Sequence, residues 1–449
     1  MKTRKIILLV FLGCFLFSLV VIVPLTLFVS FTINKRIQRM DNAAMYYNKA
    51  FKLCSEKHWD KKVEEVVGKG WRGEYKDLEG LLNRNKAMFM EFENGIQLKR
   101  CDFSFGKVYD NPFAQPFPNL LKVRNLSQLV LLKGRWHEAQ NDYDEAMRNY
   151  LSLLTFTQHI SQDRLLVSVM IATAVELMAS VPLQQYLERD EVDMQLCKRI
   201  KDFLQRAEPQ RSIIADAFKK EREAYMWAAR VMSKKVGIRD RDLMRSFRGV
   251  GSKYYGLLVK YARTNSETDK RYLEEELDFL SRRCSTLCSA LMEQYTSKDW
   301  PECIDKYLSS LKENLKTATR EEKDKGAELL ACGTVPSLIK AVNSYYDPKA
   351  KLRILKLAAA IRLYIFQEGR LPDTLDNLIP DYLEAIPLDP WSGQPLIYVR
   401  QGRQFTLYSF GPDRTDNNGT GVGFETVLES IKELEGKDIV FSATPSIPN

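Results

Sequence analysis

The chain has 449 residues, of which 45% are hydrophobic and 28% are charged, and this composition excludes a globally disordered protein. The length is sufficient for two or three domains or for one elongated domain. The formal net charge of +9 is modest, and basic and acidic residues are mixed along the helical segments, as on solvated helix faces. No nucleic-acid-binding motif is present, so we expect no nucleic-acid partner.

The first feature along the chain is an apolar run of 28 residues, from Ile6 to Ile33. About 20 apolar residues span a bilayer, so this run predicts a transmembrane helix. It is too long for the apolar core of a cleaved signal peptide, and no Ala-x-Ala-like cleavage site follows it. We therefore expect a single-pass anchor that holds the protein in the membrane through residues 6–33.

The charges beside this run do not determine its orientation. Three basic residues precede the run and three follow it: Lys2, Arg4, Lys5, Lys35, Arg36 and Arg39. The positive-inside rule therefore gives no preference. The short N-terminal tail favours a signal-anchor, and long C-terminal domains are translocated largely regardless of charge.

Residues from Asp41 to about Asn343 have a helical pattern. Apolar residues recur at spacings of three and four, as in Leu165–Met178. Glycines and prolines predict breaks between the helices, and these breaks fall at residues 68–73, 111–118, 182, 209 and 249–256. The lengths between the breaks predict antiparallel helical hairpins.

One of these hairpins, residues 129–150, resembles a tetratricopeptide unit. The small Gly134 would let two helices approach, and Ala146 would pack between them after the turn. We find no second copy at a period near 34 residues, and stacked arrays need at least three units. Ordinary packing of a single hairpin is therefore favoured over a peptide-binding array.

Residue types that carry chemistry are sparse. The eight cysteines show no Cys-x-x-Cys spacing, and the three histidines, His58, His137 and His159, have no spaced partner for a metal pair. No zinc-protease, nucleophile-elbow, P-loop or dinucleotide-binding motif is present. We predict that the protein is not an enzyme, while catalysis by residues distant in sequence stays open.

The C-terminal quarter has a different pattern. Apolar and polar residues alternate through Leu396–Val399 and Phe405–Tyr408 around a glycine-containing turn, which predicts a β-hairpin. Prolines at 387, 390 and 395 exclude a central strand before the hairpin, so an ordered extended corner is expected there. We expect Trp391 to be buried between the hairpin and the C-terminal half of the helix that ends near Phe366.

Three motifs of this region resemble the C-terminal domain of the major pseudopilin of type II secretion systems. They are Gly369–Pro372 after a long helix, the Leu-Asp-Pro-Trp-x-Gly-x-Pro corner at Leu388–Pro395, and the Tyr-Ser-x-Gly-x-Asp loop at Tyr408–Asp413. The Asp438-Ile439 pair resembles the end of the same loop in that family. The likeness covers about residues 350–440 and implies a small α+β unit with a short antiparallel sheet. The membrane-embedded Glu motif of true pseudopilins is absent, so pilin processing and filament assembly are not implied.

In that family the loop wraps a calcium ion, and the resemblance implies the same cofactor here. Two carboxylates and two main-chain carbonyls would bind the ion, and neighbouring acidic and amide side chains supply further hard oxygen atoms of the kind that Ca²⁺ prefers. The candidate metal ligands are Asp413, Asp438, Phe410, Thr415, Asp416 and Asn418.

The alternative is that Asp, Asn and Gly only form turns in this loop. Two departures from the family pattern favour it. Asn417-Asn418-Gly419 stands where the family has Gly-Gly, and a helix-like insert, Glu425–Ile431, separates the loop from Asp438.

The expected fold is therefore mainly α, in three parts: a tail and transmembrane anchor (1–40), a helical domain (41–345) and a pseudopilin-like C-terminal domain (346–449). We expect a protein of the cytoplasmic (inner) membrane with residues 40–449 outside, on the periplasmic side. Its expected role is structural or interactive, with a protein partner in a secretion or envelope assembly. The alternative is a helix-rich extracytoplasmic hydrolase, which would be favoured by a cleft where polar side chains converge from several helices.

Overall fold

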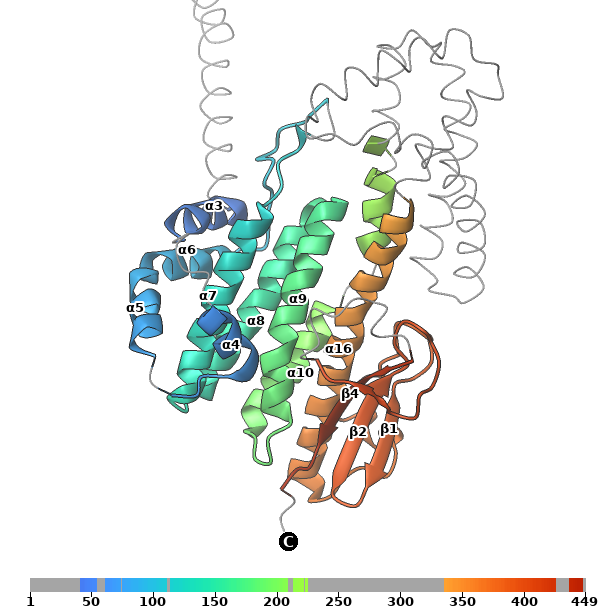
Figure 1. Cartoon of the computed structure of the whole chain (residues 1–449). Helices are drawn as coiled ribbons and strands as arrows, with labels where there is room; N and C mark the ends of the chain where they lie inside the picture. The colour runs from blue at the N-terminus through green and yellow to red at the C-terminus, as the bar shows by residue number, and fades with distance from the viewer. Residues whose placement is uncertain are drawn as a thin grey trace, which may run out of the picture.

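Figure 1 shows the computed structural model of the chain, which describes residues 41–54, 61–73, 75–110, 114–208, 213–221, 223–224, 335–424 and 436–446. The expected transmembrane run at 6–33, the expected break at 249–256 and the insert at 425–431 lie outside the described residues. As the sequence patterns predict, the described part is mainly helical and carries one small sheet.

The described helices are α3 (Ala43–Leu53), α4 (Lys61–Lys69), α5 (Lys76–Arg84), α6 (Lys86–Ile96), α7 (Leu120–Ala139), α8 (Tyr143–Ile160), α9 (Leu166–Leu187), α10 (Met194–Ala207) and α16 (Val335–Glu368). Two short 3-10 helices are η3 (Ser161–Asp163) and η4 (Leu375–Leu378). The strands are β1 (Ile397–Gln401), β2 (Gln404–Ser409), β3 (Gly421–Val422) and β4 (Asp438–Ala443).

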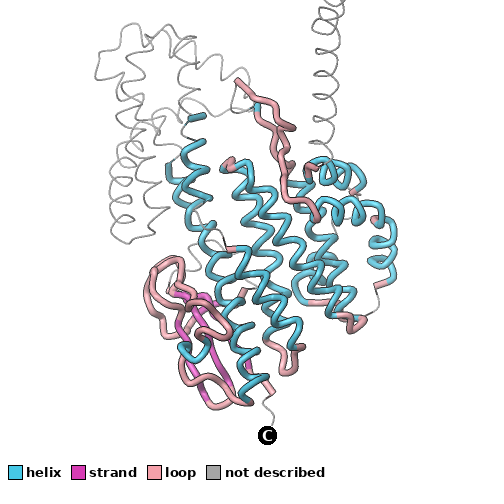
Figure 2. Tube along the Cα trace, turned by 180° about the vertical axis from the view of Figure 1, so that it is seen from behind, coloured by secondary structure: helices cyan, strands magenta, loops and turns pink. Residues whose placement is uncertain are grey.

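The long helices form one layer. Helices α7, α8, α9 and α16 lie side by side in that order, with α10 against α8 and α16 (Figure 1). The shorter helices α3 to α6 pack on the outer side of α7, and the sheet packs on α16 at the other edge (Figure 2). A continuous hydrophobic core runs through all of these elements, from Ala43 to Ala443.

Helix α9 is the central element of the layer because it is apolar on every side. It lies between α8 and α16, and a helix that is hydrophobic all round requires burial of this kind. Among the described helices it alone is long and apolar enough to cross a bilayer, but 67% of its most apolar window is buried inside the protein, as in the core helix of a globular fold.

The expected break at Pro182 is wrong. Proline lacks an N–H donor and costs a helix about 3 kcal/mol, yet α9 continues for five residues to Leu187. The residues that follow the proline, including Leu183, Tyr186 and Leu187, are buried in the core. Their burial against the neighbouring helices offsets the lost hydrogen bond.

Several helix starts follow from local sequence. The helices α3, α7, α8 and α10 each begin after an Asn or Asp whose side-chain oxygen accepts a hydrogen bond from a backbone N–H of the first turn. These N-cap residues are Asn42, Asn119, Asp142 and Asp193. Such caps satisfy N–H groups that have no partner within the helix.

The sheet has the strand order β1-β2-β4-β3. Strands β1 and β2 form the predicted hairpin around the two-residue turn Gly402-Arg403, where Gly402 has φ +62°, as such turns require. Strand β4 is antiparallel to β2, but β3 is parallel to β4. The expected short antiparallel sheet is therefore a mixed one: β1, β2 and β4 pair as expected, while the two-residue β3 adds a parallel pair, which the 15 residues between Val422 and Asp438 allow.

Helix α16 joins the helical layer to the sheet, so the expected division at 345/346 falls inside a helix that both parts share. Buried Arg362 donates from Nε and Nη2 to the carbonyl of Leu187 at 3.1 and 2.7 Å, and further to the carbonyls of Arg189 and Asp190. This arginine satisfies carbonyls at the C-terminal end of α9, where a cation also complements the helix dipole.

Candidate metal loop and its supporting corner

The proline-rich corner is built around Trp391, which is 1% exposed. The expected burial of this side chain is therefore confirmed. Its ring lies 5.7 Å from that of Tyr346, in the N-terminal half of α16, so the helix contributes to this burial from a point before the C-terminal half that we expected to cover it. Arg353, near the middle of α16, donates a hydrogen bond to the carbonyl of Leu388 at 2.8 Å and also holds the corner on this helix.

The polar centre of the corner is Asp389, whose side chain is 2% exposed. Its carboxylate accepts hydrogen bonds from the corner itself, at 3.2 Å from the N–H of Trp391 and at 2.9 Å from the hydroxyl of Ser392. It also accepts bonds from the loop after β2, at 2.7 Å from the hydroxyl of Ser409 and at 3.3 Å from the N–H of Phe410. The two most characteristic motifs of this region are thus joined through one buried carboxylate.

Asp389 is not among the residues predicted for the site, although its sequence neighbours indicate its role. A carboxylate between apolar residues and a proline must accept hydrogen bonds if it is buried. The Ser in the Tyr-Ser-x-Gly-x-Asp motif is the matching donor.

The loop from Ser409 to Val422 returns to the sheet through β3 and lies directly against β4. A Cβ atom on Gly421 would lie 1.9 Å from the carbonyl oxygen of Asp438, so the parallel pairing of β3 with β4 requires glycine there. Gly411 has φ +69°, and a Cβ on it would lie 2.9 Å from the carbonyl oxygen of Lys437. Close backbone approach therefore brings the two ends of the loop together.

Three of the predicted ligands meet at Asn417. The side-chain Nδ2 of Asn417 donates to the carboxylate of Asp413 at 3.3 Å and to the carbonyl of Thr415 at 3.0 Å. Its backbone N–H donates to the carboxylate of Asp438 at 3.3 Å. The insert therefore does not carry Asp438 away from the loop. The side-chain amide of Asn417 thus lies beside the oxygen atoms of Asp413 and Thr415 that were predicted to bind a cation.

The other predicted ligands point elsewhere. The carboxylate of Asp416 accepts from the hydroxyl of Tyr408 at 3.2 Å and from the N–H of Asn418 at 2.8 Å. Asn418 has φ +56°, so it serves the turn through its backbone. Within the described residues, no hydrogen bond joins Phe410 or the side chain of Asn418 to the group around Asn417.

The electrostatics of the loop are those of a buried, unneutralised carboxylate. Burial raises the pKa of Asp438, and hydrogen bonds from Gly419 and Asn417 oppose this shift while the nearby charge of Asp416 adds to it. No Lys or Arg forms an ion pair with Asp438 within the described part of the chain. A cation would remove this cost. Nevertheless, the described residues contain no group of three or more His, Cys, Asp or Glu side chains placed to hold a metal ion. The oxygen atoms that the loop offers to a cation are those of two carboxylates, Asp413 and Asp438, and of main-chain carbonyls.

A second candidate site is a cavity of about 240 Å³ between α8, α9, α10 and α16. Glu176 of α9 lies in its wall, and its two carboxylate oxygens accept hydrogen bonds from Lys349 of α16 at 2.8 and 2.7 Å. Glu208 beside it accepts from Arg353 and Lys356, both at 2.7 Å. Polar side chains from several helices therefore converge here, where Glu176 is paired with one cation and Glu208 with two.

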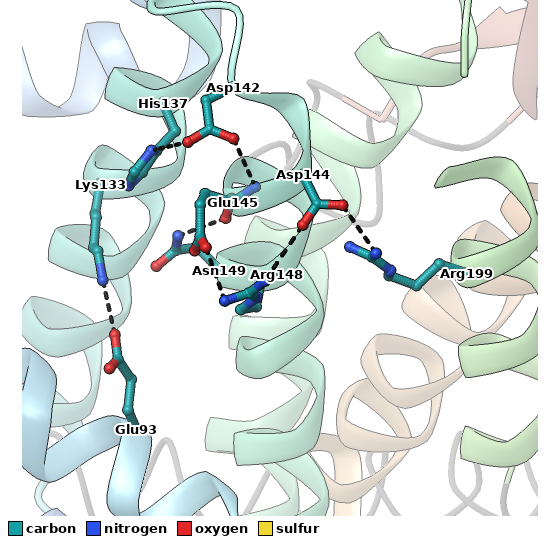
Figure 3. A network of polar contacts seen from close by, with 9 residues as sticks. All are labelled: Glu93, Lys133, His137, Asp142, Asp144, Glu145, Arg148, Asn149 and Arg199. Atoms are coloured by element: carbon teal, nitrogen blue, oxygen red, sulfur yellow. Dashed lines mark hydrogen bonds and ion pairs between the residues drawn. The ribbon is translucent and has the colours of Figure 1, made fainter. Parts of the chain in front are cut away.

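A polar network lies around the turn between α7 and α8 (Figure 3). Asp142 caps α8 and also lies 3.0 Å from Nδ1 of His137. The hydrogen bond from Arg199 of α10 holds the pKa of Asp144 below its ordinary value and ties α10 to the start of α8. These contacts give His137 a structural partner, and none of them forms a metal pair.

Comparisons with known proteins give no further information on these sites: no protein-family model, no curated protein and no solved structure matches this chain. The likeness to pseudopilins therefore rests on the motifs of residues 350–440 alone.

Proposed function

We propose that this protein is a single-pass membrane-anchored scaffold that presents its pseudopilin-like C-terminal unit to a protein partner on the outer side of the cytoplasmic membrane. The partner belongs to a secretion or envelope assembly in this proposal. The apolar run at 6–33 is the anchor, and the single helical layer is the stalk.

The observation that carries the proposal is the position of the two ends of the layer. The described chain enters at Asn42, at the start of α3, and this start lies at one end of the long helices (Figure 1). The sheet and its loops lie at the other end, beside the C-terminal part of α16 (Figures 1 and 2). A chain anchored before Asn42 would hold the sheet away from the bilayer, which suits a unit that has to meet a partner.

Shared burial gives further support. The sheet is connected to the helical layer directly, because α16 belongs to both parts. In addition, the N–H of Phe424 donates a hydrogen bond to the side chain of Gln184 in α9 at 3.0 Å. A rigid connection of this kind holds a binding unit at a fixed height. We further propose that a weakly held Ca²⁺ orders the loop through Asp413 and Asp438, with the carbonyl of Thr415.

The test has two parts, both on the full chain. First, membranes are washed with alkaline carbonate, and protease is added to cells with a permeabilised outer envelope. We expect the protein to stay with the membrane and the helical region to be cleaved from outside.

Second, crosslinking on intact cells is compared between the unaltered chain and Asp389→Ala, which should loosen the C-terminal corner. Loss of the same crosslinked protein in the variant supports the proposal. Release by carbonate, or protection from protease, contradicts it.

A second candidate function is hydrolysis, and one observation favours it: the cavity that contains Glu176 and Lys349. A hydrolase needs a carboxylate or nucleophile that is free to contact its substrate. Here both oxygens of Glu176 are engaged by Lys349, and Oε1 is also near the hydroxyl of Thr157 at 3.3 Å. The discriminating variant is Glu176→Gln. It should leave the partner crosslink unchanged if the scaffold function is right, and it should abolish any hydrolytic activity that purified protein shows if the cavity is catalytic.

A further inference from the structure

Exposed apolar side chains gather on one segment of the described chain. Eleven large hydrophobic residues are exposed in the described part, and five of them lie between residues 105 and 121: Phe105, Val108, Phe117, Leu120 and Leu121. Val108 is 95% exposed, and Leu120 and Leu121 are 58% and 59% exposed in the first turn of α7. Single exposed hydrophobic residues are ordinary, but a group of this size on one segment indicates a contact surface.

The segment is held firmly by the body of the protein at its beginning. Asn42 donates from Nδ2 to the carbonyl of Asp102 at 2.8 Å, and its Oδ1 accepts from the N–H of Asp102 at 2.8 Å. Gln162, between α8 and α9, accepts from the N–H of Cys101 at 2.7 Å and donates to the carbonyl of Lys99 at 2.8 Å. At its other end the segment becomes α7, capped by Asn119. The segment is therefore joined to the body of the protein on both sides of its exposed side chains.

That place adjoins the point where the chain would leave the membrane. Only eight residues, 34–41, lie between the apolar run and Asn42, and Asn42 forms a hydrogen bond with Asp102 at the start of the segment. Even fully extended, eight residues span at most about 29 Å, and less in any folded form. The segment and the start of α3 lie at the same end of the helical layer, away from the sheet (Figures 1 and 2).

The charges of the segment suit an anionic surface. Residues 99–124 contain five basic and two acidic side chains. Lys99, Lys107 and Lys122 form no ion pair within the described residues. Lysines that flank exposed apolar side chains are typical of surfaces that contact anionic lipid head groups, because the cations bind phosphate while the apolar groups enter the interface.

We propose that residues 105–110 and 114–121 form a membrane-contact surface, in which Val108, Phe117, Leu120 and Leu121 enter the lipid interface of the same bilayer that holds residues 6–33. This inference rests on the proposed membrane anchor and adds to it a second contact, which would fix the tilt of the helical layer on the membrane. A single helical anchor leaves that tilt free. A defined tilt would determine where the C-terminal unit meets its partner.

The experiment uses the full chain, reconstituted in vesicles that contain phosphatidylglycerol. Leu120→benzoylphenylalanine and Phe117→benzoylphenylalanine place a photo-crosslinker on the surface, and the adducts are identified by mass spectrometry. The matched control is Met194→benzoylphenylalanine, because Met194 is also exposed, at 42%, but starts α10 near the sheet end of the layer. We expect lipid adducts at least tenfold more abundant at positions 117 and 120 than at 194. Adding Lys107→Glu and Lys122→Glu should lower the yield at 120 several-fold at low salt.

Each contrary outcome identifies a different error. If alkaline carbonate releases the full chain from the vesicles, the proposed anchor is wrong. If the chain stays bound but position 120 crosslinks to another part of its own chain, residues outside the described ranges cover the surface and the inference is overturned. Crosslinks from position 120 to a second protein, or equal lipid adducts at positions 120 and 194, overturn it as well and leave the anchor intact.

Discussion

The carboxylate of Asp389 accepts a hydrogen bond from the hydroxyl of Ser409 at 2.7 Å, and both side chains are buried. This bond connects the corner around Trp391 to the loop that follows β2. It explains in physical terms why an Asp-Pro-Trp corner and a Tyr-Ser-x-Gly loop occur together: each motif supplies what the other needs, an acceptor on one side and donors on the other.

Removal of this carboxylate should therefore unfold the C-terminal unit first. Asp389→Ala leaves the hydroxyls of Ser392 and Ser409 and the N–H groups of Trp391 and Phe410 without their acceptor, and a buried donor left in this state costs about 1–3 kcal/mol. We expect a loss of at least about 3 kcal/mol in the free energy of unfolding. Denaturant unfolding of the full chain in detergent, followed by tryptophan fluorescence, measures it.

The matched control for this variant is Asp376→Asn, since Asp376 is an exposed acid in η4 of the same unit. Its effect should stay within about 0.5 kcal/mol. Equal effects of the two substitutions would show that Asp389 does not hold the corner.

Helices α7 and α8 approach so closely that only glycine fits at position 134. A Cβ atom there would lie 2.3 Å from Cε1 of Tyr150, whose side chain is fully buried. Gly134→Ala should cost about 1–3 kcal/mol by overpacking, although alanine is the better helix former. Gly68→Ala in α4 is the control, because no atom lies within 4 Å of the added methyl group, and it should stabilise the chain slightly. If Tyr150→Leu, combined with Gly134→Ala, recovers none of the loss, the clash is not its cause.

Buried His159 predicts a loss of stability in mild acid. Burial lowers its pKa from the ordinary 6.5 to about 4, and its Nδ1 accepts a hydrogen bond from the hydroxyl of Tyr47 at 2.6 Å. The unfolded chain takes up the proton near pH 6.5 and the folded chain only near pH 4. The folded state is therefore fully favoured above pH 6.5 and loses about 3 kcal/mol as the pH falls from 6.5 to 4.

The measurement is the free energy of unfolding of the unaltered chain minus that of His159→Asn at each pH. The asparagine amide oxygen replaces the Nδ1 acceptor and does not titrate, so the difference should fall steadily from pH 6.5 to 4. His137→Gln serves as the control, because His137 is only partly buried and its ring lies beside Asp142 at the α7–α8 turn. A difference that is constant with pH would contradict the burial of a neutral His159.

Sequence patterns predicted those parts of the fold that depend on interactions between residues close together in the chain. The hairpin of β1 and β2 follows from strict alternation around Gly402, and the helix starts follow from Asn and Asp caps. Trp391 was correctly predicted to be buried because three prolines leave a large aromatic side chain as the filler of that corner.

Contacts between distant residues were not predictable in this way. The parallel pairing of β3 with β4 depends on where a 15-residue connection returns, and Pro182 stays helical only because its neighbours are buried by other helices. In the candidate site, acidic composition suggested ligands, but the sequence did not show that the amide of Asn417 would lie between them.

That amide makes the proposed calcium site testable with two opposite substitutions. Asn417 donates to the oxygen atoms of Asp413 and Thr415 that a cation would bind, so Ca²⁺ has to displace its NH₂ group. Millimolar Ca²⁺ should raise the melting temperature of the full chain in detergent relative to a chelator, by an amount that corresponds to ~2.7 kcal/mol at one hundred times the dissociation constant. Mg²⁺ should substitute poorly, because it requires a smaller octahedral shell.

The substitution Asn417→Asp should strengthen this response. It turns the blocking donor into a third carboxylate, which lowers stability in the chelator through repulsion with Asp413 and Asp438 and increases the gain on adding Ca²⁺. Asp413→Asn removes one of the two proposed carboxylate ligands and should abolish the response, while its effect in the chelator stays small because an amide can still hydrogen-bond to Gly436. If the melting temperature of the unaltered chain is the same in Ca²⁺ and chelator, and Asn417→Asp is destabilised equally in both, then the loop is closed by Asn417 itself and binds no calcium.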